Sequence, residues 1–526
     1  MLKLAVSWFA GLVAPLWVCC ASGQIATNSP NPDWAVLRQR CLDRPRRVIF
    51  NNDGNEPVYF CNAATAEELL RSRTAPLAGS QVDTIFYCTW SSGFGLFTHH
   101  TKTGQLFTNR EAMFANNQTQ EFLDKHLDPL SIMVQFAHSN RMELFWSMRM
   151  NDTHDGSRAE YGPVMFRANT LKQRHPDWLI GSKERPPRYG AWSAVDYGTP
   201  QIRDLAFRYC EEVCQNYDVD GIELDFFRHA FFFKCSGAGE PCGQAELSQM
   251  SDLLRRLRSM MDRQGRIRNR PILLAIRVPD SVEYCRLIGL DLETWLAEHL
   301  VDIMVVGGYT QFNPWQYSVA LGHKFGVKVY PSLDESRVRD EAARKHRASP
   351  DAYRGRALSA WESGVDGIYM FNFFDPHSPL WRELGDPAVL RTRNRNYFAS
   401  VQGVGSIPVP HQKFIRVPTL NPASPVAISP RSDLTMEFWT GEDFRETSAK
   451  PQTTLHLQFK DSAPQLRASL NGTKLTNGTA WGPWLEFALE DGLLRSGSNK
   501  LLIELAPSEK QKKSLLDLYV SVIESL

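Results

Sequence analysis

The chain has 526 residues, enough for one large barrel with a partner or for about three or four ordinary domains. Hydrophobic residues make up 43% and charged residues 22%, a globular composition that excludes a disordered, collagen-like or coiled-coil chain. Lys and Arg total 59 against 58 Asp and Glu, so a formal net charge of +1 gives no general attraction for nucleic acid or an anionic membrane.

The first residues have the layout of a secretory signal. One Lys precedes an apolar stretch from Leu4 to Val18, and the small residues Ala21 and Gly23 follow, which predicts cleavage after Gly23. A retained membrane anchor is the alternative, although the stretch is shorter than the ~20 residues that a spanning helix needs. We therefore expect a signal peptide over 1–23 and a secreted or periplasmic protein.

An exported location permits disulfides. Cys235 and Cys242 flank the short loop SGAGEP and are the pair that we predict, with Cys41 to Cys61 as a second pairing. Cys210 and Cys214 lie four residues apart on a predicted helix, where burial as small apolar side chains is favoured over metal ligation.

From about residue 45, short β-rich runs alternate with amphipathic helical runs. Strands are predicted at 47–50, 83–90, 143–150, 221–227, 272–278, 302–308, 328–333 and 367–374. Helices are predicted between them at 65–73, 128–140, 199–217, 244–264, 290–300 and 352–364. This alternation predicts an α/β fold, a (β/α)8 TIM barrel over 41–400. A doubly wound open sheet is the alternative, but no glycine-rich phosphate fingerprint follows its first strand.

The long segments between predicted elements all follow strands. They are residues 91–127, 151–198 and 228–245, after the second, third and fourth strands. In a barrel such loops lie on the carboxyl-end rim, where active sites are built. Long ordered loops commonly wall a cleft, so this asymmetry favours a functional site on that rim.

The pattern changes after Ser400. Residues 401–412 read as a linker, and 413–526 contain strand-like runs separated by Gly, Asn and Pro turns, with no helix between them. This predicts a small all-β sandwich. The phrases LRASLNGTKL and LRSGSNKLLIEL resemble the jelly-roll or galactose-binding-like domains attached to many glycoside hydrolases, with Asn471-Gly472 as a hairpin turn.

The fourth strand carries the sharpest chemical signal. Period-two alternation puts Glu223 and Asp225 on one face, and the apolar face must pack against helices, so both carboxylates point into the barrel. Two carboxylates buried together disfavour double ionisation, which suits a general acid beside a nucleophile or base. The structural alternative is that these carboxylates only pair with Arg149, Arg228 or Arg277.

Glycoside cleavage usually needs a second carboxyl group. Asp334 and Glu335 follow the seventh strand on the same rim; Glu335 is preferred, because Asp334 has the alternative of capping the next helix. The predicted catalytic residues are therefore Asp225, Glu335 and Glu223. Trp146 and Phe374 are further candidate stacking faces. Strand-end residues predicted to bind substrate are Asp53, Trp90, Arg149, Asp152, His154, Arg228, Arg277, Tyr309, Asp334 and Asn372.

The segments YDVDGIELDFFRH and RHPDWL, with the barrel layout and the β-sandwich partner, resemble bacterial glycosyl-hydrolase-like proteins of the family 10 type. The resemblance implies a TIM barrel and a sugar-polymer substrate. A partial match to the α-amylase-like nucleophile strand places the nucleophile on Asp225, but Glu223 replaces the expected Arg. Phe227 stands where chitinase-type hydrolases carry their catalytic Glu, which argues against chitinase chemistry.

We therefore predict a secreted glycoside hydrolase with a carboxylate pair on the rim, acting on a poly- or oligosaccharide. The alternatives are a non-catalytic carbohydrate-binding protein and a polysaccharide lyase using Arg149, Arg228 and Tyr309. No HExxH or CxxC spacing indicates a metal, no G-x-S-x-G follows a strand, and no cofactor is expected. The sequence does not indicate an oligomeric state.

Overall fold

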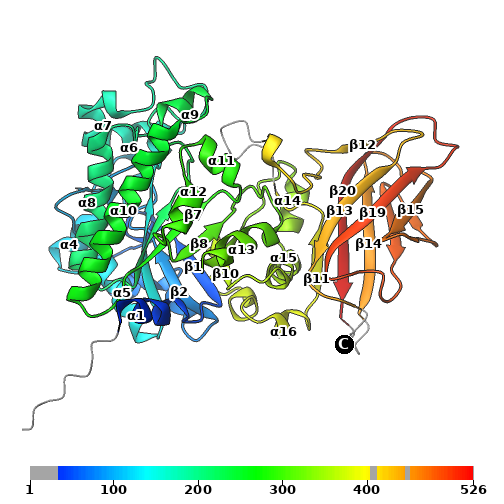
Figure 1. Cartoon of the computed structure of the whole chain (residues 1–526), viewed down its shortest axis with the longest axis horizontal. Coiled ribbons are helices and arrows are strands. Elements are labelled where there is room, and N and C mark those ends of the chain that lie inside the picture. The colour runs from blue at the N-terminus through cyan, green and yellow to red at the C-terminus, as the bar shows by residue number, and fades with distance from the viewer. Residues whose placement is uncertain (1–32, 403–411, 445–450, 525–526) are drawn as a thin grey trace, which may run out of the picture.

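The computed structural model describes residues 33–402, 412–444 and 451–524, and the predicted signal peptide lies outside them. The chain forms a barrel surrounded by helices and, beside it, a domain made of strands (Figure 1). Among the described residues, no helix has the length and apolar character needed to cross a bilayer.

Eight parallel strands close into a barrel, which confirms the predicted TIM barrel and rules out the open sheet. Each strand pairs with its neighbours in the order β1-β2-β5-β6-β7-β8-β9-β10, and β10 returns to β1. The strands are β1 (Val48–Asn52), β2 (Val82–Tyr87), β5 (Glu143–Arg149), β6 (Gly221–Asp225), β7 (Leu273–Val278), β8 (Ile303–Val306), β9 (Lys328–Asp334) and β10 (Ile368–Phe371).

Helices cover the outside of the barrel. They are α1 (Trp34–Leu42), α3 (Ala66–Arg71), α5 (Pro129–Ser139), α8 (Pro200–Asn216), α10 (Gln244–Ile267), α11 (Val282–Leu287), α12 (Leu292–Ala297), α13 (Trp315–Lys324), α14 (Glu341–Arg347) and α15 (Pro350–Glu362). The helix α8 packs against α10 and buries Cys210 and Cys214, as predicted for small apolar side chains. Helix starts follow local chemistry: the Asp128 carboxylate accepts the backbone N–H groups of Leu130 and Ser131 at the start of α5.

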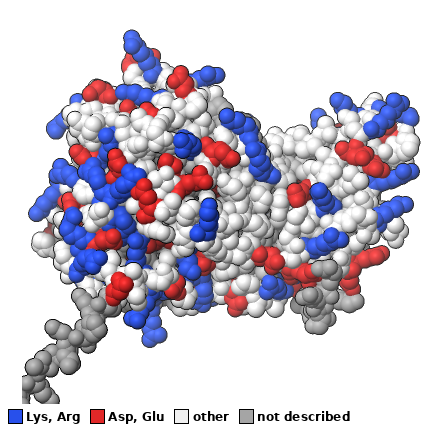
Figure 2. Space-filling view, viewed as in Figure 1, with Lys and Arg blue, Asp and Glu red and all other residues white. Residues whose placement is uncertain are grey.

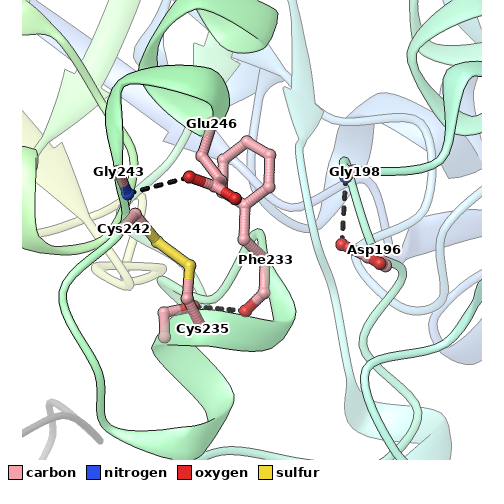
Figure 3. The surroundings of a disulfide bond; sticks show 8 residues. Asp196, Gly198, Phe233, Cys235, Cys242, Gly243 and Glu246 are labelled. Atoms are coloured by element: carbon pink, nitrogen blue, oxygen red, sulfur yellow. Dashed lines mark hydrogen bonds between the residues drawn. A yellow bond between two sulfur atoms is a disulfide. The ribbon is translucent and has the colours of Figure 1, made fainter.

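The long loops build up the carboxyl-end rim. They contain β3 (Leu96–Phe97), β4 (Gln105–Leu106), α4 (Thr119–Asp124), α6 (Tyr161–Ala168), α7 (Thr170–Arg174) and α9 (Lys234–Ala238). The loop after β6 is closed by the predicted disulfide between Cys235 and Cys242 (Figure 3). Just beyond it, Glu246 accepts the backbone N–H of Gly243 at 2.8 Å and caps α10.

The second predicted disulfide is wrong: Cys41 and Cys61 are both free. Cys61 is buried in a small separate cluster with Ala64, Leu69 and Phe122, whereas Cys41 packs at the edge of the main core. The two thiols belong to different packed regions, which sequence spacing does not reveal.

The C-terminal part is a sandwich of two antiparallel sheets, as predicted. One contains β11 (Arg395–Phe398), β20 (Lys513–Ile523), β14 (Gln452–Phe459), β18 (Trp484–Ala488), β17 (Thr479–Trp481) and, paired with β20, β12 (Val426–Ile428). The other contains β13 (Leu434–Thr440), β19 (Gly497–Leu505), β15 (Leu466–Leu470) and β16 (Thr473–Lys474). Asn471 and Gly472 form the predicted hairpin turn, both with positive φ.

A strand at the end of the barrel segment and a buried ion pair join the barrel to the sandwich. The strand β11 precedes the predicted boundary at Ser400, yet it pairs with β20 of the sandwich. Arg347 on α14 makes a buried ion pair with Asp517 on β20, at 2.6 Å. In Figure 2 the surface where the two parts meet shows few charged side chains, in contrast to the helices over the barrel. The two parts are therefore packed together rather than loosely tethered.

Candidate active site

Glu223, on β6, is a buried carboxyl group inside the barrel. It accepts hydrogen bonds from the hydroxyls of Ser147 on β5 and Tyr369 on β10, the latter at 2.8 Å. Burial, with a smaller contribution from the charge of Asp225, raises the pKa of Glu223 to about 7. Glu223 thus faces the interior, as predicted, and is held by hydroxyl groups rather than by an arginine.

Asp225 lies on the same face of β6 and is paired with an arginine. Its Oδ1 accepts the backbone N–H groups of Phe227 and Arg228 at 3.0 and 2.9 Å, and its Oδ2 lies 3.4 Å from Nη1 of Arg277 on β7. Asp225 is 1% exposed and Arg277 is fully buried. Nε and Nη2 of Arg277 have no hydrogen-bond partner among the described residues. Asp225 is therefore paired with Arg277, which was the structural alternative to a catalytic role.

The two acidic residues after β9 differ in their surroundings. Asp334 is 2% exposed, whereas Glu335 is exposed to solvent. Burial raises the pKa of Asp334 to about 7 against the attraction of Arg356 and Arg277, and its Oδ2 has no partner among the described residues. Asp340 caps the next helix, α14, so the capping alternative for Asp334 is wrong. A buried carboxyl group with a raised pKa is suited to donate a proton near neutral pH.

A pocket of about 440 Å3 opens at the carboxyl-end rim, where the loops after β5 to β9 meet. Tyr309, which follows β8, forms part of its wall, and the Tyr309 hydroxyl accepts hydrogen bonds from Arg228 at 2.8 Å and from Asn372 at 2.5 Å. Tyr309 also lines a second, small cavity with Asp334 and Glu335. Asp225 is not among the lining residues of either. Tyr309 thus stands between the rim pocket and the raised-pKa carboxyl group.

Asp152 organises a hydrogen-bond network beside the pocket. Its carboxylate accepts from His154 Nδ1 at 2.8 Å and from the backbone N–H of Gly93 at 2.8 Å, and it lies 3.4 Å from Arg149. Burial raises the pKa of Asp152, but His154, His229 and Arg149 together hold it well below its ordinary value. A carboxylate only accepts, so Nδ1 of His154 carries a proton and its Nε2 accepts from Arg228 at 3.0 Å.

Asp152, His154 and His229 offer atoms within 4.8 Å of one another, a spacing that a metal ion could use. These atoms already form hydrogen bonds within the protein. His154 Nδ1 donates to Asp152, and His229 Nδ1 accepts the backbone N–H of Thr153 at 3.1 Å. The guanidinium of Arg228 beside His154 adds a positive charge that disfavours a cation. These side chains therefore fit a hydrogen-bond network better than a metal centre.

Other predicted binding residues lie away from the pocket. Asp53 is paired with Arg73 at 2.5 Å. Trp90 is 3% exposed, and its ring stacks on Phe107 at 4.5 Å between centroids. Arg149 donates to the backbone carbonyl of Ser91 at 2.5 Å. The residues of the binding prediction that line the rim pocket are His154, Arg228 and Tyr309.

Of the further stacking candidates, Trp146 is fully buried and donates to Thr89, and Phe374 packs under the guanidinium of Arg73. None of these rings faces the rim pocket.

Three rim residues adopt positive φ without being glycine: Trp90 at 95°, His229 at 57° and Asn372 at 53°. They follow β2, β6 and β10. Such strained conformations cost free energy and are concentrated at functional sites, where the surrounding structure holds them.

Sequence reasoning missed three residues of the site. Arg337 lines the pocket, with its guanidinium carbon 3.3 Å from the centre of the Tyr309 ring. Tyr369 donates to Glu223 from across the barrel, and Arg356 on α15 donates to the backbone carbonyl of Asp334 at 2.8 Å. Arg337 could have been found from its place in the loop after the seventh strand, but no local signal marks the other two.

Part of the barrel matches a known family of proteins. Residues 54–245, which contain β2, β5 and β6 with their loops, match the family model described as Glycosyl hydrolase-like 10, and this confirms the predicted resemblance. A curated relative, the glycosyl hydrolase YngK of Bacillus subtilis (strain 168), is 27% identical over 131 residues. That match covers 24% of this chain and 22% of the relative, so the chain spans less than a quarter of the relative's length.

Several carbohydrate enzymes are among the solved structures to which the chain is similar at low sequence identity. The GH36 α-galactosidase AgaB from Geobacillus stearothermophilus is 15% identical, with 88% of this chain and 56% of that chain covered and a TM-score of 0.38. A glycoside hydrolase family 18 N-acetylglucosaminidase from Paenibacillus barengoltzii is 14% identical, with 66% and 99% covered and a TM-score of 0.35. An Anoxybacillus α-amylase is 10% identical, with 88% and 99% covered and a TM-score of 0.36.

Proposed function

We propose that this protein is an exported glycoside hydrolase that cleaves O-glycosyl bonds of a poly- or oligosaccharide bound at the carboxyl-end rim. The observation that carries the proposal is Asp334: a buried carboxyl group whose pKa is raised to about 7, in a cavity that shares Tyr309 with the rim pocket. The match to a glycosyl hydrolase-like family supports the same class of reaction.

In this proposal Asp334 is the general acid that protonates the leaving oxygen, and Asp225 is the nucleophile or base. Asp225 accepts two backbone N–H groups and faces Arg277, an arrangement that fixes one orientation of its carboxylate. Arg277 attracts both Asp225 and Asp334, so it links the two sides of the site. Glu335 is exposed beside Asp334 and remains the other candidate for the acid.

A non-catalytic carbohydrate-binding barrel is the second candidate function. It is favoured by one observation: Asp225 is 1% exposed, is paired with Arg277 and does not line the rim pocket. In that case the carboxylates would stabilise the barrel interior and take no part in bond cleavage.

Turnover of the purified protein on a panel of polysaccharides tests the proposal. Asp225→Asn and Asp334→Asn should each lower kcat by a factor on the order of 10² or more with little change in KM. Because Asp334 must hold a proton to act as the acid, the rate should fall as the pH rises through about 7, and this limb should disappear in Asp334→Asn.

Asp433→Asn, an exposed position in the sandwich, is the matched control and should retain full turnover. Glu335→Gln separates the two candidate acids, because a loss confined to Glu335→Gln would assign the proton to Glu335. Binding of a glycan without cleavage would favour the binding protein instead. Undiminished turnover in a stably folded Asp225→Asn variant would remove Asp225 from the mechanism.

A further inference from the structure

We propose that the rim pocket recognises an anionic group, a carboxylate or sulfate ester, carried by a sugar ring of the substrate. The inference rests on the proposed function in taking a sugar as the ligand and goes beyond it in naming its charge. The pocket is lined by two arginines, Arg228 and Arg337, and by His154 and His229. None of its lining residues is an aspartate or glutamate.

Arg228 is a half-buried cation whose hydrogen-bond partners are neutral. Its Nη1 donates to the Tyr309 hydroxyl at 2.8 Å and its Nη2 donates to His154 Nε2 at 3.0 Å. Its Nε is buried without a partner, and no carboxylate in the described part of the chain lies within ion-pair distance of it. Burial lowers the pKa of Arg228, and the charges of Arg149 and Arg337 act in the same direction, whereas Tyr309 and the more distant Asp152 carboxylate oppose them.

Arg337 also lacks an ion pair, and it too lies against Tyr309. Its guanidinium stacks on the Tyr309 ring at 3.3 Å, and it makes no hydrogen bond or ion pair with the described residues. Its Nε is also buried without a partner. Asp334 is close enough to feel its charge but forms no ion pair with it.

His229 adds a neutral donor to these two cations. Its Nδ1 accepts the backbone N–H of Thr153, and burial lowers the pKa of His229 well below its ordinary value. The ring is therefore neutral, with the proton on Nε2, a tautomer that can donate to an acceptor in the pocket.

Uncompensated buried charges are costly, and proteins usually neutralise them with a counter-charge. Here the counter-charge is absent from the protein walls, while planar guanidinium groups are preferred partners of carboxylate and sulfate oxygens. An oxyanion placed between Arg228 and Arg337 would satisfy both. The carboxylate of a uronic acid and the sulfate of a sulfated sugar share this chemistry.

Calorimetric titration with matched sugar pairs tests the inference on the full-length protein. Oligogalacturonate is compared with its uncharged methyl ester, and a sulfated galactan oligosaccharide with its desulfated form. At least one charged sugar should bind tenfold or more tightly than its neutral counterpart, and the pair that shows the difference identifies the anion. Arg337→Gln and Arg228→Gln should each weaken this binding by about 10- to 100-fold.

The exposed sandwich residue Arg467 supplies the control, Arg467→Gln, whose affinity should equal that of the parent. Arg337→Gln removes a cation that makes no ion pair, so the melting temperature of this variant should be unchanged. Weaker binding by this variant could then not be ascribed to unfolding. Equal binding of charged and neutral sugars, or parental affinity in both Arg228→Gln and Arg337→Gln, would overturn the inference.

The binding readout separates this inference from the proposed function. Tight binding of the charged sugar without cleavage supports the anion pocket and contradicts the hydrolase. Cleavage with formation of an unsaturated sugar end supports the anion pocket and replaces hydrolysis by elimination. Hydrolysis of neutral sugars alone leaves the hydrolase in place and overturns the anion pocket.

Discussion

Glu223 carries a pH dependence of stability that can be measured. The folded carboxyl group keeps its proton up to about pH 7, whereas in the unfolded chain it releases it near its ordinary value of 4.5. As pH rises between these values only the unfolded state gains the solvated charge, so Glu223 lowers the free energy of unfolding by about 3 kcal/mol at pH 8 relative to pH 4. At acidic pH this penalty is absent.

We therefore expect Glu223→Gln to be more stable than the parent at pH 8 and similar to it at pH 4. Glutamine resembles the protonated acid, and the hydroxyls of Ser147 and Tyr369 can rotate to match its amide. Urea denaturation at both pH values measures the difference, with the exposed Glu67→Gln as control. An equal effect of Glu223→Gln at both pH values would mean that Glu223 is ionised in the folded protein across this range.

At the residue scale, the sequence predicts the face of a strand on which a side chain lies better than it predicts the residues that the side chain contacts. Strand alternation correctly placed Glu223 and Asp225 on the inner face because the period of two is a local property. Arg277 was among the arginines named as partners of these carboxylates. Tyr369 was not, since it lies 146 positions from Glu223 and is brought to it only by barrel closure. Trp90 shows the opposite failure: its positive φ turns a strand-end ring towards Phe107 and away from the pocket.

At the element scale, the ends of all eight barrel strands were predicted to within three residues. The prediction succeeded because β-rich runs and helical periodicity depend on residues that are close together in the sequence. The strand β11 was missed, since it is short and depends on pairing with β20, more than a hundred residues later. The loops were recognised by length, but their internal packing was not, because it rests on contacts such as Asn151 Nδ2 to the carbonyl of Val195 at 2.8 Å.

The disulfide in the loop after β6 gives a prediction at this scale. The bond joins residues separated by seven positions, in the segment that follows the pocket residues Arg228 and His229. Replacing both cysteines by serine should lower the free energy of unfolding by about 2–3 kcal/mol, because the unfolded loop regains conformational freedom. Chemical denaturation measures this loss. The other cysteines offer no good control; Cys285, for example, is buried, and its replacement by serine would itself change stability. The double variant is therefore compared with the parent protein in its oxidised and reduced forms. Equal stability of parent and variant under non-reducing conditions would show that the bond does not stabilise this loop.

At the scale of the whole molecule, the barrel and the sandwich hold each other in place. A boundary near Ser400 was predicted from the change from alternating strands and helices to strands alone. The structure places β11 and the guanidinium of Arg347 against β20, so contacts of the barrel's last helices are completed by the C-terminal strand. Gly355 on α15 also abuts the carbonyl of Asn396, leaving no space for a larger residue. The pattern of predicted elements shows where the architecture changes, but not how the two parts pack against each other.

The ion pair between Arg347 and Asp517 is the contact that tests this coupling. Arg347 is fully buried; two of its nitrogens bind the Asp517 carboxylate at 2.6 and 2.8 Å, and its Nε donates to the carbonyl of Ser400 at 2.9 Å. Asp517→Asn leaves a buried charge uncompensated and should cost about 3–5 kcal/mol of stability. Calorimetry should show barrel and sandwich melting at a lower temperature together. The exposed Asp461→Asn should change stability by less than about 0.5 kcal/mol. A loss confined to the sandwich, with the barrel transition unmoved, would show that the two parts unfold separately.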